Sequence, residues 1–130
     1  MMARAGDTLD LPIRKGIIKY DATDSAVSLD HPIGIMIAAT TDFDVRSTAK
    51  GIIIGAYPTN EHKWVVIIKG DDGLYYDYGQ LDFVQVKKGQ PLGRGAKIGR
   101  LNESDREGRT LFFAVMRGDR FLKAENYVSH

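Results

Sequence analysis

Short stretches of alternating apolar and polar residues run along most of the chain, and glycines separate them. This period of two is typical of strands that bury one face, and the β-branched and aromatic residues in GIIIGAY, KWVVIIKG and TLFFAVMR also favour strands. We expect strands at Gly16–Tyr20, Gly34–Ala39, Gly51–Ala56, Lys63–Lys69, Leu74–Leu81, Phe83–Val86, Lys97–Leu101 and Thr110–Arg117. DSAVSLD (24–30) and FLKAENYV (121–128) are expected to form single helical turns at most. The pattern therefore predicts an all-β fold, a compact antiparallel sandwich or barrel of short strands with little or no helix.

Glycine-rich turns set the order of these strands. GDDG at 70–73 consists of residues that tolerate positive φ, and it predicts a hairpin. Together with the turn around Pro58, this makes the segment from Gly51 to Leu81 a meander of three antiparallel strands. Further along, VKKGQPLGRGAKIG (86–99) spaces its glycines at Gly89, Gly95 and Gly99. We expect each of these three glycines to mark a tight bend in a two-hairpin corner.

Length and composition limit the class of protein. The 130 residues, 43% hydrophobic and 27% charged, suit one domain over 1–130, in which residues 1–12 form an edge segment or a loose tail. A net charge of +1 argues against nucleic acid as the main partner, because no excess of Lys and Arg neutralises phosphates. Without cysteine, the chain has no disulfide, thiolate zinc ligand or cysteine nucleophile. We expect no transmembrane segment, since no apolar run approaches ~20 residues, and the start shows no signal-peptide core.

Isolated acidic and basic residues add little catalytic evidence. A paired-carboxylate hydrolase needs two carboxylates facing across one cleft, and the acid pairs here are better explained as solvated faces or turns. Asp77 alternates with Tyr76 and Tyr78, so we expect it on the opposite strand face from them, in solvent. Lys69, before the GDDG turn, is the nearest equivalent of the hairpin-tip lysine of a carrier domain.

Five segments of the chain carry a resemblance to a known family. From about Ile13 to Arg117 they read PIGIMIA, AKGIIIGA, KWVVIIKGDDGLYYDYGQL, VQVKKGQPLGRGAKIG and TLFFAVMRGDR. In order and spacing they resemble the lysostaphin-type (LytM-like) zinc metallopeptidase domain, with its HxGxD, Y.HL, glycine-corner and HxHFE segments. The resemblance implies the duplicated hybrid motif fold. The same corner also occurs in biotinyl/lipoyl carrier domains and in sugar-phosphotransferase IIA domains.

The metal-ligand positions that the resemblance implies bear no zinc ligand in this chain. Zinc needs three or four nitrogen, oxygen or sulfur ligands that converge, and the base that activates the zinc-bound water is also missing. The three histidines, His31, His62 and His130, are scattered. We therefore expect no catalytic residue, no metal and no cofactor. The former ligand positions fall on Pro32, Met36, Gln80, Thr110 and Phe112, with Ala114 in place of a glutamate.

Aromatic residues concentrate in the segments that wall the groove of the active family. Alternation places Tyr76, Tyr78 and Gln80 on one face, so we expect them to line the groove, and we expect Phe112 to fill the vacated metal pocket. The resemblance implies a non-catalytic binding or regulatory module for cell-wall peptide or a partner cell-wall enzyme, in the envelope. Two alternatives stay open. One is an active zinc peptidoglycan endopeptidase with rearranged ligands, and the other is a biotinyl/lipoyl-type carrier or scaffold domain.

Overall fold

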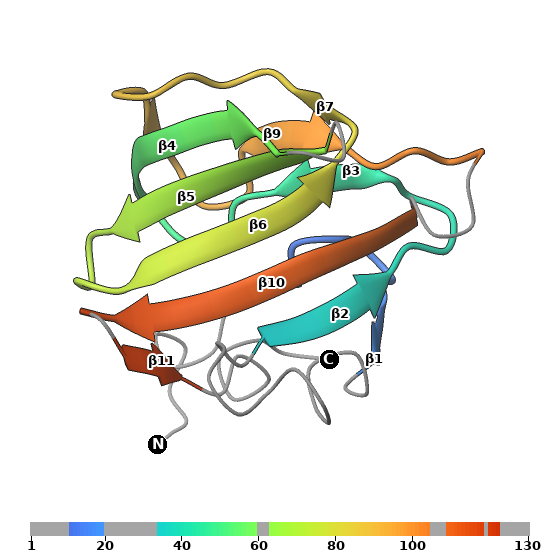
Figure 1. The fold of residues 1–130 in the computed structure, drawn as a ribbon, viewed down its shortest axis with the longest axis horizontal. Helices are drawn as coiled ribbons and strands as arrows, with labels where there is room; N and C mark the ends of the chain where they lie inside the picture. Colours follow the sequence, from blue (N-terminus) through green and yellow to red (C-terminus); the bar gives the residue numbers. More distant parts are fainter. Residues whose placement is uncertain (1–10, 20–33, 60–62, 105–108, 119, 123–130) are drawn as a thin grey trace.

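The fold consists of two antiparallel β-sheets (Figure 1). The computed structural model describes residues 11–19, 34–59, 63–104, 109–118 and 120–122. The larger sheet has the strand order β1-β2-β10-β6-β5-β4-β8, with β11 paired to β10, and the smaller sheet has the order β3-β9-β7. The strands are β1 (Ile17–Lys19), β2 (Gly34–Ala38), β3 (Asp44–Arg46), β4 (Gly51–Pro58), β5 (Trp64–Gly70), β6 (Tyr75–Leu81), β7 (Phe83–Val84), β8 (Pro91–Leu92), β9 (Lys97–Arg100), β10 (Thr110–Arg117) and β11 (Arg120–Leu122).

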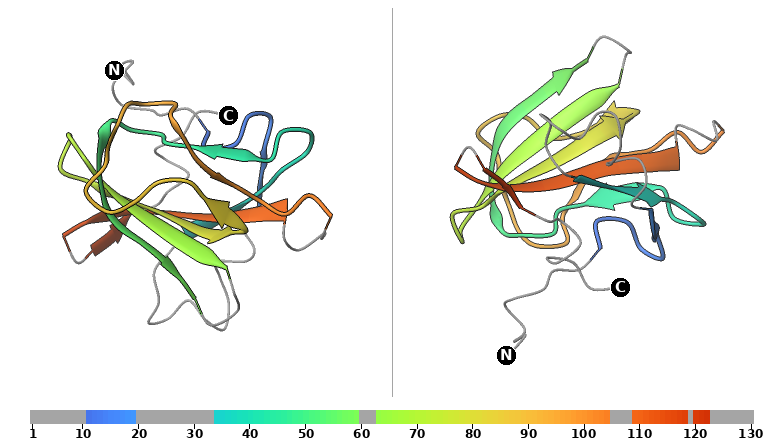
Figure 2. Two further views of the ribbon diagram at one scale, coloured as in Figure 1. Left: turned by 90° about the horizontal axis from the view of Figure 1, so that it is seen from above. Right: turned by 60° about the horizontal axis from the view of Figure 1, so that its bottom comes forward.

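The core lies between the sheets, because the smaller sheet covers one face of the larger one (Figure 2). We call the covered face of the larger sheet its inner face and the opposite face its outer face. Alternation assigns side chains to the two faces: Ile35 and Ile37 of β2 are buried, whereas Met36 between them is partly exposed. Phe113 of β10 stacks against Tyr78 of β6, with ring centroids 5.3 Å apart. Aromatic and β-branched residues therefore fill the space between the sheets.

Strand β10 lies in the middle of the larger sheet although it comes from the last part of the chain (Figure 1). It pairs with β2 on one side, where Phe112 is opposite Met36, and with β6 on the other side, where Phe112 is opposite Gly79. The central position of β10 brings together segments that are far apart in the sequence. The outer face of β2, β10 and β6 is where the former ligand positions are expected to meet.

The predicted all-β fold of antiparallel sheets is confirmed, and no α-helix occurs within the described residues. The meander of β4, β5 and β6 is antiparallel as expected, and Gly73 of the predicted hairpin has φ of +86°. Strands β3, β8 and β11 were not expected, because two or three residues are too few to show alternation. The strand expected at Phe83–Val86 ends at Val84.

The glycine corner is only partly as expected. Gly89 and Gly95 have positive φ, of 93° and 86°, and both lie in turns. Gly99 does not mark a bend, because it lies inside β9, paired with Val45 and Val84. A Cβ at Gly99 would collide with the carbonyl oxygen of Phe83, so the glycine permits close approach of two strands.

Three expectations concern segments that the structure describes in part or not at all. The turn expected at 24–30 lies outside the described residues, as do residues 1–10 of the predicted edge segment or tail. The turn expected at 121–128 is wrong at its start, because residues 121 and 122 belong to β11, and its remainder is not described.

Candidate functional site

The candidate site is the outer face of the larger sheet where β2, β10 and β6 run side by side. Met36, Phe112 and Gly79 form one row across the three strands through their backbone pairing. Thr110 precedes Phe112 by two residues on β10, so it shares that face, and it pairs with Ala38. Met36, Thr110 and Phe112 are each partly exposed, whereas their neighbours along the strands are buried. The structure therefore brings three of the predicted positions together, while Pro32 lies outside the described residues.

The ring of Phe112 lies over Gly34 rather than standing free. A Cβ at Gly34 would be 2.5 Å from two ring atoms of Phe112, Cε1 and Cζ. Gly34 is paired with Ala114, two residues along β10, so the ring leans diagonally across the sheet to β2. Beside it, Ala114 is fully buried without belonging to the core cluster between the sheets. An apolar patch of Met36, Phe112 and Ala114 thus occupies the centre of the outer face.

Gln80 owes its orientation to a β-bulge. Trp64 pairs with Leu81 and Val65 pairs with Gly79, so Gln80 is an extra residue in β6. Its φ is 73°, in the left-handed region that residues other than glycine seldom adopt. Leu81 is fully buried and Gln80 is partly exposed, so the alternation is reset by one position. The prediction that Gln80 shares a face with Tyr76 and Tyr78 is therefore wrong, because the bulge turns its side chain away from the core.

Tyr76 and Tyr78 are core residues and do not line a groove. Their exposed fractions are 1% and 0%, which contradicts the role expected for them. The Tyr78 hydroxyl accepts a hydrogen bond from the backbone N–H of Thr48 at 2.9 Å and lies 2.7 Å from the Thr48 hydroxyl. Burial raises the pKa of Tyr78 to about 12, so it stays protonated. Tyr76 donates a hydrogen bond to Asp72 in the β5–β6 turn at 2.5 Å.

The environment of Asp77 differs from the solvated one that the sequence predicts. Asp77 is on the opposite face from the two tyrosines, as expected, but it is only partly exposed to solvent. Its Oδ1 atom is buried and has no hydrogen-bond partner within the described part of the chain. Its backbone neighbours are Ala114 on β10 and Ile67 on β5. Burial raises the pKa of Asp77 to about 6. An Asp in the middle of an aromatic strand is uncommon, and that was the available signal in the sequence.

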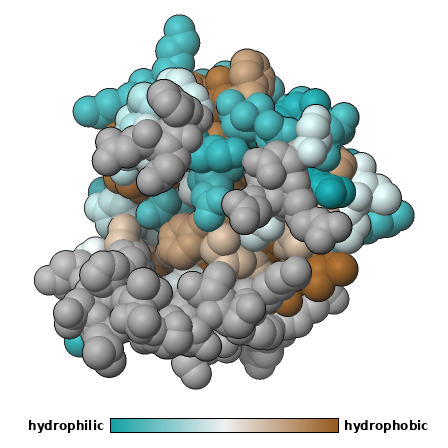
Figure 3. Space-filling model, turned by 45° about the vertical axis from the view of Figure 1, so that its right-hand side comes forward, coloured by the Kyte–Doolittle hydropathy of each residue, from teal (hydrophilic) through white to brown (hydrophobic). Residues whose placement is uncertain are grey.

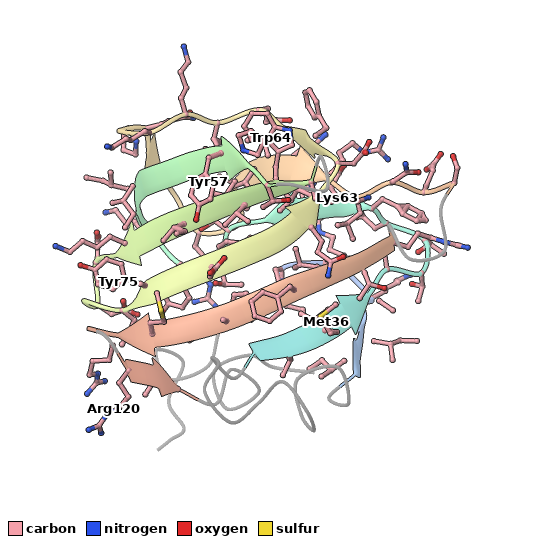
Figure 4. All side chains as sticks on the ribbon, viewed as in Figure 1. Met36, Tyr57, Lys63, Trp64, Tyr75 and Arg120 are labelled. Carbon is pink, nitrogen blue, oxygen red and sulfur yellow. The ribbon has the colours of Figure 1, made fainter. Side chains whose placement is uncertain are left out.

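Apolar and aromatic side chains extend the outer face toward β4. Tyr57 is 46% exposed and its ring lies over Gly55, since a Cβ there would be 3.4 Å from the ring. Figure 4 shows Met36, Tyr57 and Tyr75, from three different strands, on the face of the larger sheet that is turned to the viewer. Hydrophobic residues also gather across the middle of the molecule in the space-filling view (Figure 3). We call the surface formed by Met36, Tyr57, Tyr75 and Phe112, with Asp77 among them and Ala114 buried beneath it, the outer-face patch.

Comparison with known proteins identifies the family of this chain. The sequence profile described as Peptidase family M23 matches residues 30–124, which is most of the chain. The chain belongs to Peptidase family M23. No curated protein matches it significantly. The resemblance to the lysostaphin type of domain is thereby confirmed, and the M23 profile spans every strand from β2 to β11.

Solved structures share the fold of this M23 domain at low sequence identity. A chain of the SpoIIQ–SpoIIIAH pore-forming complex aligns with a TM-score of 0.73 and 18% identity, over 96% of this chain and 93% of that chain. Csd3 of Helicobacter pylori aligns with a TM-score of 0.69 and 23% identity, over 97% of this chain and 36% of its own. Lysostaphin aligns with a TM-score of 0.65 and 17% identity, over 88% of this chain and 49% of its own. These likenesses concern the fold, and this M23 domain spans about a third of Csd3 and half of lysostaphin.

The side chains at the centre of this M23 domain do not fit a zinc ion. Phenylalanine offers no donor atom and methionine offers a soft thioether, which suits copper(I) better than zinc. The described residues contain no group of three or more His, Cys, Asp or Glu side chains that could hold a metal. His31, His62 and His130 lie outside the described residues. Met36 and Phe112 therefore do not provide the converging nitrogen and oxygen ligands that a zinc ion needs.

Two further observations bear on the alternatives. Lys69 lies within β5, paired with Ile52 and Tyr75, so it is not at a hairpin tip as a carrier lysine must be. The tip itself is formed by Asp71 and Asp72. As for membranes, the described residues include no helix with the length and apolar character needed to span one.

Proposed function

We propose that this M23 domain is non-catalytic and acts as a binding or regulatory module in the cell envelope. It would recognise cell-wall peptide or a partner protein through the outer-face patch. The observation that carries the proposal is the Phe112 ring, which covers Gly34 beside Met36 where the family resemblance implies metal ligands. A domain whose central outer surface is apolar, with Tyr57 and Tyr75 beside it, is suited to binding rather than to hydrolysis.

The fold relatives support a binding role in a limited way. A chain of similar fold belongs to a complex with a second protein, the SpoIIQ–SpoIIIAH pore-forming complex. The alignment covers 93% of that chain, so a domain of about this size forms nearly all of it. We infer from this that an M23 fold can serve as an assembly module, and we extend that role to this chain as a proposal.

Asp77 adds a chemical preference to the proposed surface. Its Oδ1 atom is buried without a hydrogen-bond partner among the described residues, in surroundings where a cationic group of a ligand would be attracted more strongly than in water. A peptide amino group or a lysine or arginine of a partner protein has this character. We therefore propose that the ligand brings a positive charge to the middle of the patch and apolar groups to Phe112 and Tyr57.

The test uses purified peptidoglycan sacculi and two matched variants. We expect the domain to sediment with sacculi without releasing soluble peptide. Tyr57→Ser should weaken binding about tenfold, because loss of an aromatic contact typically costs more than 1 kcal/mol. Phe83→Ser is the control, since Phe83 is also an exposed aromatic residue, 53% against 46%, but belongs to the smaller sheet.

Each result separates the candidate functions. Catalytic release of peptide by the wild-type domain would overturn the proposal and favour the active endopeptidase. Equal loss of binding in Tyr57→Ser and Phe83→Ser would show that the outer-face patch is not the binding surface. If sacculi are not bound, a photo-crosslinking amino acid at position 57, compared with position 83, tests the partner-protein form of the proposal in the producing cell.

A further inference from the structure

A cavity lies beside the smaller sheet and shares no residue with the outer-face patch. It has a volume of about 310 Å³ and is bounded by the segment 11–15, by the end of β3 and by the turn at Gly95. Leu11 and Ile13 form its apolar part. Three basic side chains, Arg14, Lys15 and Arg46, line the rest, and none of the described lining residues is acidic. The cavity therefore combines an apolar base with a concentration of positive charge.

Backbone hydrogen bonds hold the walls of this cavity in place. The N–H of Arg46 donates to the carbonyl of Pro12 at 2.8 Å, which ties the segment 11–16 to β3. The N–H of Gly95 donates to the carbonyl of Ser47 at 2.8 Å, which connects the turn at Gly95 to the residue that follows Arg46. Ile13 is fully buried in the core and anchors its own segment. The basic side chains thus project from a preformed backbone frame.

Arg46 is a cation that its surroundings compensate incompletely. Its Nη2 atom is 3.8 Å from Oδ2 of Asp44, at the outer limit of an ion pair. Asp44 makes closer contacts with Nε of Arg100, at 3.0 Å, and with Nζ of Lys97, at 3.2 Å. One carboxylate therefore serves three cations. The Nη1 atom of Arg46 donates to the Gly95 carbonyl at 3.2 Å, and its Nε is buried without an acceptor in the described residues.

Arg14 and Lys15 add positive charge that no acidic side chain among the described residues compensates. Neither side chain forms an ion pair or a hydrogen bond within the part of the chain that the structure describes. The backbone of Lys15 has φ of 60°, in the left-handed region, and its carbonyl is held by the Thr40 hydroxyl at 3.0 Å. A residue held in this conformation by its surroundings is often found at a binding site. This backbone conformation sets the direction in which the Lys15 side chain leaves the chain.

We propose that this cavity binds an oxyanion, the phosphate or carboxylate group of a ligand, between Arg14, Lys15 and Arg46. The planar guanidinium groups of arginine match such groups with paired N–H donors, and lysine adds a compact charge. An anion in the cavity would supply the acceptors that Asp44 cannot supply to all of its neighbours. The site is independent of the proposed function, because none of its residues lies on the outer face.

The test is an NMR titration of the ¹⁵N-labelled domain with inorganic phosphate and, separately, with acetate at constant ionic strength. We expect saturable shifts of the amide signals of Arg14, Lys15, Arg46 and Gly95. Arg14→Gln should raise the Kd about tenfold, because a charge-assisted hydrogen bond contributes about 1.5 kcal/mol or more. Lys69→Gln is the matched control, since it removes one exposed positive charge from β5, away from the cavity, and should leave the Kd unchanged.

The outcomes of the titration are decisive for the site. Saturation by phosphate, by acetate or by both supports it and identifies which oxyanion the cavity accepts. Shifts that rise linearly without saturation, or a Kd that is the same in Arg14→Gln as in the wild-type domain, overturn it. Lys15→Gly provides a second variant that suits the left-handed backbone, so a loss of binding there does not come from unfolding.

Discussion

At the scale of single residues, Asp77 makes the stability of the domain depend on pH. Burial raises its pKa in the folded state to about 6, whereas an unfolded Asp has a pKa of about 3.9. The folded state therefore holds the proton more tightly than the unfolded state. The free energy of unfolding is highest below about pH 4, falls as the pH rises toward about 6, and loses nothing further from this group above that.

Replacing Asp77 by Asn removes this dependence. The pKa difference corresponds to a gain of about 3 kcal/mol for Asp77→Asn at pH 7.5, and to little change at pH 3.5. Urea unfolding of both proteins at the two pH values measures the effect, and subtracting the wild-type values cancels the titration of every other group. Equal stability differences at both pH values would show that Asp77 is solvated in the folded domain.

At the scale of elements, the hydrogen bond between Tyr78 and Thr48 ties β6 to the chain between β3 and β4. The Tyr78 hydroxyl is the acceptor for the Thr48 N–H, and both residues are fully buried. Removing the hydroxyl leaves a buried N–H and a buried threonine hydroxyl without this partner. This hydrogen bond therefore helps to hold β6 against the segment that connects β3 to β4. It acts in addition to the contact between the Tyr78 ring and Phe113.

Tyr78→Phe keeps the ring and isolates the hydroxyl. We expect it to lower the free energy of unfolding by about 1–3 kcal/mol, the usual cost of leaving a buried polar group unpaired. Thermal or urea unfolding measures the loss. Tyr75→Phe is the control, because Tyr75 lies on the outer face and should change stability by less than about 0.5 kcal/mol. Similar losses in both variants would contradict the role given to the Thr48 link.

The elements also show what the sequence could predict. Alternation located the long strands β4, β5, β6 and β10, and the family resemblance placed Met36, Thr110 and Phe112 on one face of neighbouring strands. Alternation failed at Gln80, because a bulge adds one residue, and the only sign of it in the letters YGQL is a glycine inside the strand. It also failed for Tyr76 and Tyr78, because a period of two separates the faces of a strand without saying which face is covered.

At the scale of the whole molecule, the two sheets carry different surfaces. The larger sheet has a largely apolar outer face with a partly buried acid, whereas the smaller sheet has cations gathered around Asp44 and the cavity beside it. The structure thus places a largely apolar face with one acid and a basic cavity on different parts of one small domain. This separation allows each surface to be tested by substitution without disturbing the other.

The proposal also predicts that the stability of the whole domain is independent of metal. A tightly bound zinc ion would raise the unfolding temperature, because it binds the folded state and not the unfolded one. We expect the unfolding temperature to be the same with and without a chelator, and the purified domain to contain no stoichiometric zinc. Zinc at one ion per chain, together with a lowered unfolding temperature after chelation, would contradict the proposal and favour the endopeptidase with rearranged ligands.

The central position of β10 has a consequence for how the chain folds during synthesis. Neither β2 nor β6 has its neighbour on that side until residues 110–117 have left the ribosome. Until then, the unpaired backbone N–H and C=O groups along the open edges of both strands are accessible to other chains, and contacts between distant segments of this kind form slowly. Met36 and Phe112 meet only when β10 is added, so the proposed binding face exists only in a chain that has completed its larger sheet. A truncated product would be prone to aggregation and would lack the face altogether.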